Sequence, residues 1–425
     1  MTPTTAELIR VFGRIGLLSF GGPAAQIALM HRELVTTRNW MTEAEFLRAL
    51  SFCMMLPGPE AMQLATYAGW RMRGTLGGLI GGGLFVIPGA LIVLGLAMTY
   101  AAFGAVPLAQ AVFVGVQAAV LAIVVQALMK LARRAVIGPV QAGIALAAFI
   151  GLFFFALPFP LIVLAAGLIG FAQSPQAERP DAPPAQQGDG LQRRAVRTAF
   201  LWGALWLVPL AMLGLWPGGF LFEIGLFFSQ LAVVTFGGAY AVLAWMTQAV
   251  VQDKMWLTLP QMVDALGLAE TTPGPLILVT EFVAYLAGHG HGKGGVGLGI
   301  AAALIALWMT FVPCFLWVFT GAPFIERLAH APRLSASLAA ITAAIVGVIA
   351  NLSIWFGLHV LFASVNTVEI GPLTLFWPAL ASLRPLPLCL AILAALCLFW
   401  RGWPLLAVLA SSAGLSLIAG LFGTP

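Results

Sequence analysis

The chain reads SFGG at residues 19–22 and PGP at residues 57–59, and 216 positions later it reads TFGG at residues 235–238 and PGP at residues 273–275. The similarity runs without a gap from residue 12 to residue 83, and it includes Trp40, which returns as Trp256. The chain is therefore two copies of one unit, and both copies interrupt apolar segments with glycine and proline at the same places. In a membrane, duplicated and interrupted segments indicate a secondary transporter whose site lies where the copies meet.

The amino-acid composition indicates that the chain lies in a lipid bilayer. Of 425 residues, 61% are hydrophobic and 8% are charged, whereas a soluble domain carries about 25% charged residues. Apolar runs of about 20 residues are long enough to cross a bilayer as helices, and an outer-membrane barrel would show short alternating strands instead. The sequence predicts an all-α polytopic membrane protein of the bacterial inner membrane. The net charge of +5 does not indicate nucleic-acid binding, because the arginines and lysines gather at segment ends.

The apolar runs divide the chain into two repeats joined by a linker. We expect a first repeat in residues 1–173, a disordered cytoplasmic linker in residues 174–196 and a second repeat in residues 197–425. Residues 371–383 are apolar but short, and we expect a partial or re-entrant segment there. The total is about thirteen segments: 8–31, 44–70, 75–103, 107–131, 136–155, 158–173, 197–217, 222–250, 258–287, 294–320, 333–360, 386–400 and 402–421.

The number of crossings decides the orientation of the second repeat. Seven crossings separate the starts of the two repeats if the PGP segments cross the membrane, and an odd number inverts the second copy. Positive charges support inversion, since Arg133 and Arg134 follow the fourth segment while Arg327 and Arg333 precede its counterpart. If the PGP segments are re-entrant hairpins instead, the repeats are parallel.

The PGP and FGG motifs should break their helices inside the membrane. Proline lacks an N–H and clashes with the preceding turn, and lipid tolerates the freed backbone groups only where protein or water satisfies them. The helix that restarts after each break should point its N–H groups and positive dipole end into a polar cavity, which suits an anion. Plain proline kinks and close helix packing are the alternatives. The candidate substrate-binding residues in these motifs are Phe20, Gly21, Gly22, Pro57, Gly58, Pro59, Phe236, Gly237, Gly238, Pro273, Gly274 and Pro275.

Charged residues near the breaks are further candidates, because charges within membrane segments are rare and functional. Glu60, Glu270 and Glu281 are candidates for coupling transport to protons, although Glu60 could simply cap its helix. Arg71 and Arg73 end the broken segment of the first repeat. They could attract an oxyanion through bidentate guanidinium contacts, or they could be ordinary membrane anchors.

The motifs of enzymes and pumps are missing from the sequence. It contains no Walker A motif, no GxSxG and no HExxH, and its four cysteines form no CxxC pair. We therefore expect no cofactor, no metal and no enzymatic activity. An intramembrane enzyme or a lipid-handling scaffold is the alternative from another class, but the enzyme would need a polar catalytic set.

The chain resembles the long-chain, two-domain form of the chromate ion transporter family. The resemblance rests on FGGPAAQIALM at residues 20–30, on MLPGPEAMQLATYAGWRMRGTLGGLIGGGLFVIPG at residues 55–89, and on FGGAYAVL at 236–243 and TTPGP at 271–275. It implies an inner-membrane exporter of chromate, with sulfate as the physiological analogue and with resistance to chromate as the phenotype. Sulfate or another anion as substrate, and a homodimer, stay open. The second copy has Leu276 where the first has Glu60, so a role of Glu60 would not extend to it.

Overall fold

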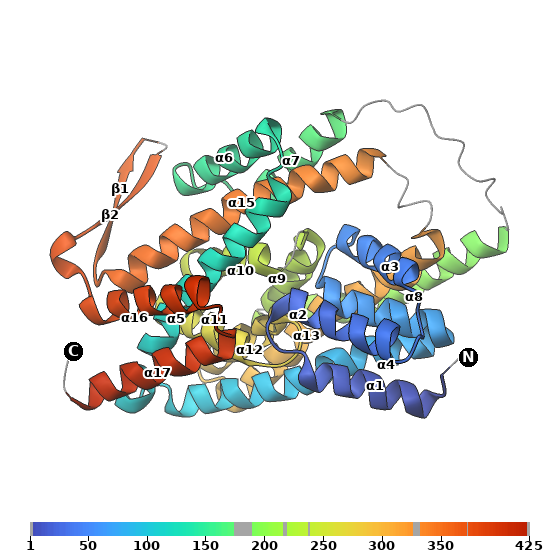
Figure 1. The fold of residues 1–425 in the computed structure, drawn as a ribbon, viewed down its shortest axis with the longest axis horizontal. Coiled ribbons are helices and arrows are strands. Elements are labelled where there is room, and N and C mark those ends of the chain that lie inside the picture. Colours follow the sequence, from blue (N-terminus) through green and yellow to red (C-terminus); the bar gives the residue numbers. More distant parts are fainter. Residues whose placement is uncertain are drawn as a thin grey trace. The chain divides into compact units, whose positions relative to one another are not determined.

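The structure is a computed structural model that describes residues 3–173, 189–215, 219–236, 239–325, 332–371 and 373–422. These residues form helices joined by short loops and one two-stranded sheet (Figure 1), which confirms the helical fold class. Five of the described helical stretches are long and apolar enough to cross a membrane, and six shorter apolar helices accompany them. The predicted total of thirteen spans stays a prediction.

The SFGG motif breaks the first predicted segment into two helices. Helix α1 (Thr5–Leu18) ends before Ser19, and α2 (Gly22–His31) begins at the second of two glycines with positive φ, +85° at Gly21 and +78° at Gly22. Such angles are strained for any residue with a Cβ atom. In the second copy, α9 (Phe220–Val234) and α10 (Ala239–Gln248) flank the TFGG motif, whose Gly237 and Gly238 lie outside the described residues.

The first PGP motif separates α3 (Glu43–Met55) from α4 (Glu60–Phe103). The 44 residues of α4 do not form one straight helix, because Arg73 and Gly74 leave helical geometry, with φ of +59° at Gly74. A Cβ atom on Gly69 would lie 2.0 Å from the carbonyl oxygen of Gly77, and one on Gly81 would lie 2.3 Å from that of Ala65. The two arms therefore pack antiparallel in a tight helical hairpin, as the predicted segment boundaries near residues 70 and 75 require.

The second PGP motif is likewise followed by two helices that pack as a hairpin. It follows α11 (Leu259–Thr271) and precedes a short 3-10 turn, η3 (Leu276–Leu278), and then α12 (Val279–Gly290) and α13 (Gly295–Gly321). Helices α12 and α13 pack along each other, and a Cβ atom on Gly288 would lie 2.6 Å from the carbonyl oxygen of Leu298. Glycine permits this close approach in both copies.

The duplication extends to details of the backbone. Each copy has a π-helical segment, η1 (Arg32–Thr37) in the first and η2 (Ala249–Asp253) in the second. A non-glycine residue with φ of +51° follows each, Asn39 in one and Met255 in the other. In each copy the cationic group of a side chain lies 5.8 Å from the centre of a tryptophan ring: Arg38 lies over Trp40, and Lys254 lies over Trp256. Positive φ is uncommon outside glycine, so its recurrence supports a common origin of the two copies.

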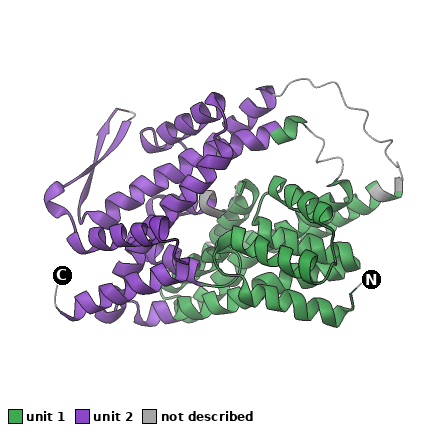
Figure 2. Ribbon diagram, in the orientation of Figure 1, with its two compact units in different colours: residues 1–98, 174–239, 272–335 green, residues 99–173, 240–271, 336–425 purple. Residues whose placement is uncertain are grey.

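The chain forms two compact units, and each unit draws on both repeats (Figure 2). Unit 1 comprises Met1–Met98, Ser174–Ala239 and Thr272–Ser335, and α13 packs in it against α8 (Asp189–Gly214), α9 and α12. Unit 2 comprises Thr99–Gln173, Tyr240–Thr271 and Ala336–Pro425. In unit 2, α5 (Pro107–Ala135) packs against α11, α16 (Pro385–Ala395) and α17 (Leu405–Leu421). Other elements are α6 (Pro139–Phe153), α7 (Phe159–Gln173), η4 (Ala322–Phe324), α15 (Pro332–Leu361), η5 (Leu380–Ser382) and η6 (Leu396–Trp400).

Two boundaries differ from the sequence prediction. The partial or re-entrant segment expected at residues 371–383 is wrong, because β1 (Val365–Ile370) pairs there with β2 (Leu373–Pro378) in an antiparallel hairpin that turns at Gly371, with φ of +60°. The strands are rich in β-branched and aromatic residues, which favour extended structure. Helix α8 begins at Asp189, so residues 189–196 are helical although we assigned them to the linker. Residues 174–188 of that linker lie outside the described residues.

Candidate functional site

The two PGP breaks lie in the same compact unit, and both are enclosed by protein. Gly58 and Pro59 of the first break are buried, as are all three residues of the second, Pro273, Gly274 and Pro275. Gly58 has φ of +125° and Gly274 has φ of +93°. A Cβ atom on Gly58 would lie 2.7 Å from Gln63 Nε2 and 2.9 Å from Cys314 Sγ. Neither position can take a side chain without local rearrangement.

Each break is bonded to the other repeat through its glycine. The backbone N–H of Gly58 donates to the carbonyl oxygen of Thr235 at 2.7 Å, and the backbone N–H of Gly274 donates to that of Ser19 at 2.9 Å. Ser19 and Thr235 occupy equivalent positions at the start of the two FGG motifs, and both are fully buried. The two bonds are therefore reciprocal, and they satisfy backbone donors that the breaks release inside an apolar protein.

Two buried glutamines satisfy the carbonyl groups of the breaks. Gln63 Nε2 donates to the carbonyl oxygen of Pro57 at 2.7 Å, and Gln26 Nε2 donates to that of Gly274 at the same distance. These bonds fix the orientation of both amides, and the Oε1 atom of each is buried without a donor among the described residues. The sequence analysis missed both glutamines. The position equivalent to Gln26 holds Val242, and the position equivalent to Gln63 holds Val279. The available signal was therefore a polar residue near a break that is replaced by valine in the other copy.

The FGG motifs end the helices that carry the two acceptor carbonyls. The backbone N–H of Phe20 donates to Leu18 and that of Phe236 donates to Val234, both at 3.0 Å. The hydroxyl groups of Ser19 and Thr235 donate to carbonyl oxygens one turn earlier, those of Ile15 and Leu231. The predicted breaks at the two motifs thus turn the backbone toward the PGP loops.

The three candidate carboxylates occupy different environments. Glu60 opens α4 directly after the first break and is half-buried, whereas Glu281 in α12 is 1% exposed. The Oε2 atom of Glu281 is buried without a hydrogen-bond partner among the described residues. Glu270 is 6% exposed near the end of α11, in unit 2. The structure thus brings Glu60 and Glu281 into the unit that holds both breaks.

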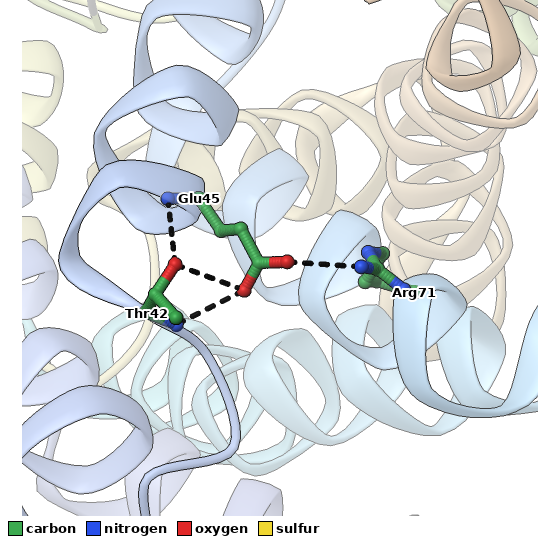
Figure 3. A network of polar contacts seen from close by, with 3 residues as sticks. All are labelled: Thr42, Glu45 and Arg71. Carbon is green, nitrogen blue, oxygen red and sulfur yellow. Dashed lines mark hydrogen bonds and ion pairs between the residues drawn. The ribbon is translucent and has the colours of Figure 1, made fainter.

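Arg71 and Arg73 lie at the turn of the α4 hairpin, and both are engaged by neighbouring protein groups. Arg71 Nη2 lies 2.9 Å from Glu45 Oε1 (Figure 3), and Glu45 also accepts from the backbone N–H of Thr42 at 3.0 Å. Arg73 Nε donates to the carbonyl oxygen of Pro3 at 2.7 Å. These contacts tie α3 and the N-terminal segment to the hairpin, and a role in anion recruitment stays a prediction.

A buried aspartate in unit 2 also escaped the sequence analysis. Asp264 in α11 is 4% exposed, and it accepts hydrogen bonds from Tyr100 Oη and from Gln117 Nε2, both at 2.7 Å. Its partners are 164 and 147 positions away in sequence, so no local pattern announces the contact. The only signal was an acidic residue in the apolar stretch MVDALGLA at residues 262–269.

The fold and these contacts define a multi-pass α-helical membrane protein made of two homologous repeats whose broken segments bond across the repeats. The described residues contain no group of three or more histidine, cysteine or acidic side chains placed to hold a metal ion. The model of the chromate transporter family matches residues 6–171 and 222–419. The chain belongs to the chromate transporter family, which consists of transport proteins and not of enzymes.

Several relatives match most of the chain. A chromate transport protein of Cupriavidus metallidurans is 31% identical over 82% of this chain and 81% of its own length. A probable chromate transport protein of Synechococcus elongatus is 31% identical over 93% of this chain and 95% of its own length. A chromate transport protein of Pseudomonas aeruginosa is 31% identical over 82% of this chain and 80% of its own length. No solved structure shows significant similarity.

Proposed function

We propose that this chain is a secondary transporter that exports chromate from the cytoplasm of a bacterium across its inner membrane. The observation that carries the proposal is the reciprocal bonding of Gly58 to Thr235 and of Gly274 to Ser19. Broken helices from two repeats that meet inside the protein are the arrangement in which secondary transporters bind substrate. The relatives named as chromate transport proteins supply the substrate.

The break residues themselves form the proposed substrate site. Helix α4 restarts directly after Pro59, so its first N–H groups and positive dipole end are directed toward the first break, which favours an anion. The second break restarts through a 3-10 turn instead. The two copies therefore contribute unequally, with the FGG and PGP residues of both lining the path and with Arg71 and Arg73 attracting chromate to one entrance.

The membrane potential is sufficient to drive export. Chromate carries two negative charges, and moving one charge through 100 mV is worth about 2.3 kcal/mol. Expelling the dianion from a negative interior therefore releases about 4.6 kcal/mol at that potential. Proton antiport through Glu60, Glu281 or Glu270 would add a pH-dependent drive.

The proposed topology is an inverted repeat with both charged connections in the cytoplasm. Helices α3 and α11, which precede the two breaks, have 13 residues each. At 1.5 Å per residue each is about 20 Å long, which is shorter than a bilayer core of about 30 Å. We infer that each completes its crossing with the helix after the break. That gives seven crossings between repeats and places residues 174–188 and the loop at Arg327 inside.

Reconstitution tests the proposed function. Purified protein in proteoliposomes should move labelled chromate when a potential is imposed, and reversing the potential should reverse the flux. Sulfate is the alternative substrate, and excess unlabelled sulfate should compete. Vesicles without protein and vesicles containing the Gly58→Ala variant are the controls. A potential-driven flux of sulfate with no flux of chromate would replace chromate as the substrate, and no flux of either would refute transport of tetrahedral oxyanions.

A further inference from the structure

The β1–β2 hairpin of unit 2 has two chemically different faces. Side chains alternate between the faces of a strand, and residues directly opposite each other in an antiparallel pair share a face. The register of the two strands assigns one face to Asn366, Val368, Ile370, Leu373, Leu375 and Trp377. It assigns the other face to Val365, Thr367, Glu369, Thr374, Phe376 and Pro378. The first of these, which we call the apolar face, carries no charge and has one amide as its only polar side chain.

The face opposite the apolar face is the one that packs on the helices of unit 2. The ring of Phe376 lies 5.7 Å from that of Phe153 in α6 and 6.4 Å from that of His359 in α15. Because the two faces of a sheet point in opposite directions, the apolar face is directed away from α6 and α15. Its side chains are accordingly exposed, by 44% at Val368, 58% at Ile370 and 70% at Trp377.

Backbone hydrogen bonds fix the hairpin in this orientation. At its base, the N–H of Ala363 donates to the carbonyl oxygen of Ser382 at 2.9 Å, and the N–H of Arg384 donates to that of Leu361 at 2.8 Å. Along its length, the N–H of Thr374 donates to the carbonyl oxygen of Phe154 at 2.8 Å. The hairpin therefore cannot turn about its base to bury the apolar face without breaking these bonds.

The position of the hairpin in the chain places it at a surface of the bilayer. It connects the end of α15, which is long and apolar enough to cross a membrane, with the start of the apolar α16 (Figure 1). Leu380 is 80% exposed and Leu383 is 43% exposed in the connection to α16, whose own Ile392 is 53% exposed. The apolar face thus continues into the surface that α16 presents to lipid.

The backbone of the hairpin limits how deep the apolar face can lie. The sheet has two strands, so each strand has an open edge, and open edges do not occur in the hydrocarbon region of a membrane. Tryptophan is enriched at the level of the lipid headgroups, because its ring is apolar and its N–H is polar. A second protein copy fits the face less well, since a stable interface takes about 20–30 residues from each side and the apolar face has six.

We propose that the apolar face of the β1–β2 hairpin is a membrane-binding surface that inserts at the level of the lipid headgroups, with Val368, Ile370 and Trp377 as its anchors. The hairpin carries one charge, that of Glu369, which lies on the opposite face. Insertion is therefore driven by burial of apolar side chains and does not need anionic lipid. The proposal concerns how the chain sits in its bilayer, and it does not depend on which substrate is transported.

Spin labels on the full chain in phospholipid vesicles test the proposal. In a background whose four cysteines are replaced, a nitroxide at Val368→Cys or Ile370→Cys should collide more often with oxygen, which dissolves in lipid, than with a water-soluble nickel chelate. Glu369→Cys lies between them in β1 on the opposite face and is the matched control, which should show the reverse preference. Greater collision with the chelate at all three positions would overturn the proposal. Dipolar broadening at Ile370→Cys that disappears on dilution with unlabelled protein would assign the face to a second copy and would also overturn it.

Quenching of tryptophan fluorescence gives a second measurement that keeps the native cysteines. Phospholipids brominated near the headgroup end of the acyl chains should quench the wild-type chain more than Trp377→Phe. Trp355→Phe is the matched control, because Trp355 lies in α15 and is 8% exposed, and it should not reduce the quenching. Equal quenching of wild type and Trp377→Phe would overturn the proposal. The loss in Trp377→Phe should be the same in phosphatidylcholine vesicles and in vesicles that also contain phosphatidylglycerol, and a loss seen only with the anionic lipid would overturn the apolar mechanism.

Discussion

The backbone N–H of Gly58 donates to the carbonyl oxygen of Thr235 at 2.7 Å, which joins the PGP break of one repeat to the FGG break of the other. Its counterpart joins Gly274 to Ser19. Each bond needs a glycine at its donor end, because φ is positive at both positions and a Cβ atom would meet Gln63 Nε2 and Cys314 Sγ at Gly58 or Leu278 Cδ1 at Gly274. Because each repeat both donates and accepts one of these hydrogen bonds, a substitution at one break should alter the backbone conformation at both breaks.

Replacing either glycine should therefore impair the protein. Gly58→Ala and Gly274→Ala each force a side chain into positive φ, which costs about 1–3 kcal/mol, and we expect a lower melting temperature and a fall in chromate flux of about tenfold or more. Gly13→Ala is the matched control, since a Cβ atom there would meet nothing within 4 Å. Wild-type flux in both break variants would show that the breaks do not shape the transport path.

Sequence reasoning recovered the helices and their breaks because glycine and proline act locally. Gly21, Gly74 and Gly274 all adopt the positive φ that their neighbours require, and the segment boundaries follow from them. The contacts across the chain could not be predicted in this way. The pairing of Gly58 with Thr235 depends on tertiary packing, and a search for charge near the breaks overlooked the neutral Gln63 beside Pro57.

The β1–β2 hairpin and the ion pair of Arg71 also depend on contacts that the sequence pattern does not reveal. Residues 371–383 are apolar over a length that suits a partial span equally well, and only the cross-strand register from Val365 to Pro378 distinguishes a sheet. Arg71 looked free to meet an anion, but Glu45 lies 26 positions earlier and pairs with it. A charge in a sequence carries no information about a partner outside its own helix.

Single variants at Arg71 and at Glu45 distinguish recruitment of the anion from anchoring of α3. The pair is half exposed and should stabilise the protein by no more than about 1 kcal/mol. If Arg71 recruits chromate, Arg71→Ala should raise KM for transport and Arg71→Lys should recover part of the loss, because the bidentate fork is missing. Glu45→Gln should then leave KM unchanged or lower it. An equal rise of KM in Arg71→Ala and Glu45→Gln would assign the pair to holding α3 against the hairpin.

Asp264 should be required for the stability of unit 2. Asp264→Leu removes the acceptor of two half-buried donors, Tyr100 Oη and Gln117 Nε2, at up to about 1–3 kcal/mol each. Tyr100→Phe removes one of the bonds and should cost less. The control is Arg48→Leu at the equivalent position of the first repeat, which is exposed and should change stability by no more than about 0.5 kcal/mol. Thermal unfolding in detergent measures all three, and an unchanged Asp264→Leu melting temperature would contradict the structural role.

Cysteine accessibility checks the proposed topology. In a background without Cys53, Cys314, Cys389 and Cys397, the substitutions Ala182→Cys and Ala329→Cys should resist impermeant maleimide in intact cells and react after lysis, because their positive flanks place them in the cytoplasm. Ala105→Cys, in an exposed and uncharged loop, is the comparator and should react from outside. Labelling of either cytoplasmic site in intact cells would exclude the inverted arrangement.

The proton coupling predicted for Glu60 can be separated from a capping role. Glu60 begins α4 beside the first break, and its equivalent in the second repeat is Leu276. If Glu60 carries the exchanged proton, Glu60→Gln should still transport chromate on the potential but lose its response to a pH gradient. If Glu60 only caps α4, the amide still accepts a backbone hydrogen bond and transport should be unchanged.

The comparison must include Glu281→Gln and Glu270→Gln, measured in proteoliposomes with the potential and the pH gradient clamped independently. Glu281 is the sharpest rival, since its buried Oε2 has no donor among the described residues and a buried charge without a partner is costly, which suits a group that binds a proton. Loss of the pH response in Glu281→Gln alone would move the coupling site to α12. A wild-type pH response in all three variants would remove these carboxylates from the mechanism and leave the membrane potential as the driving force for the dianion.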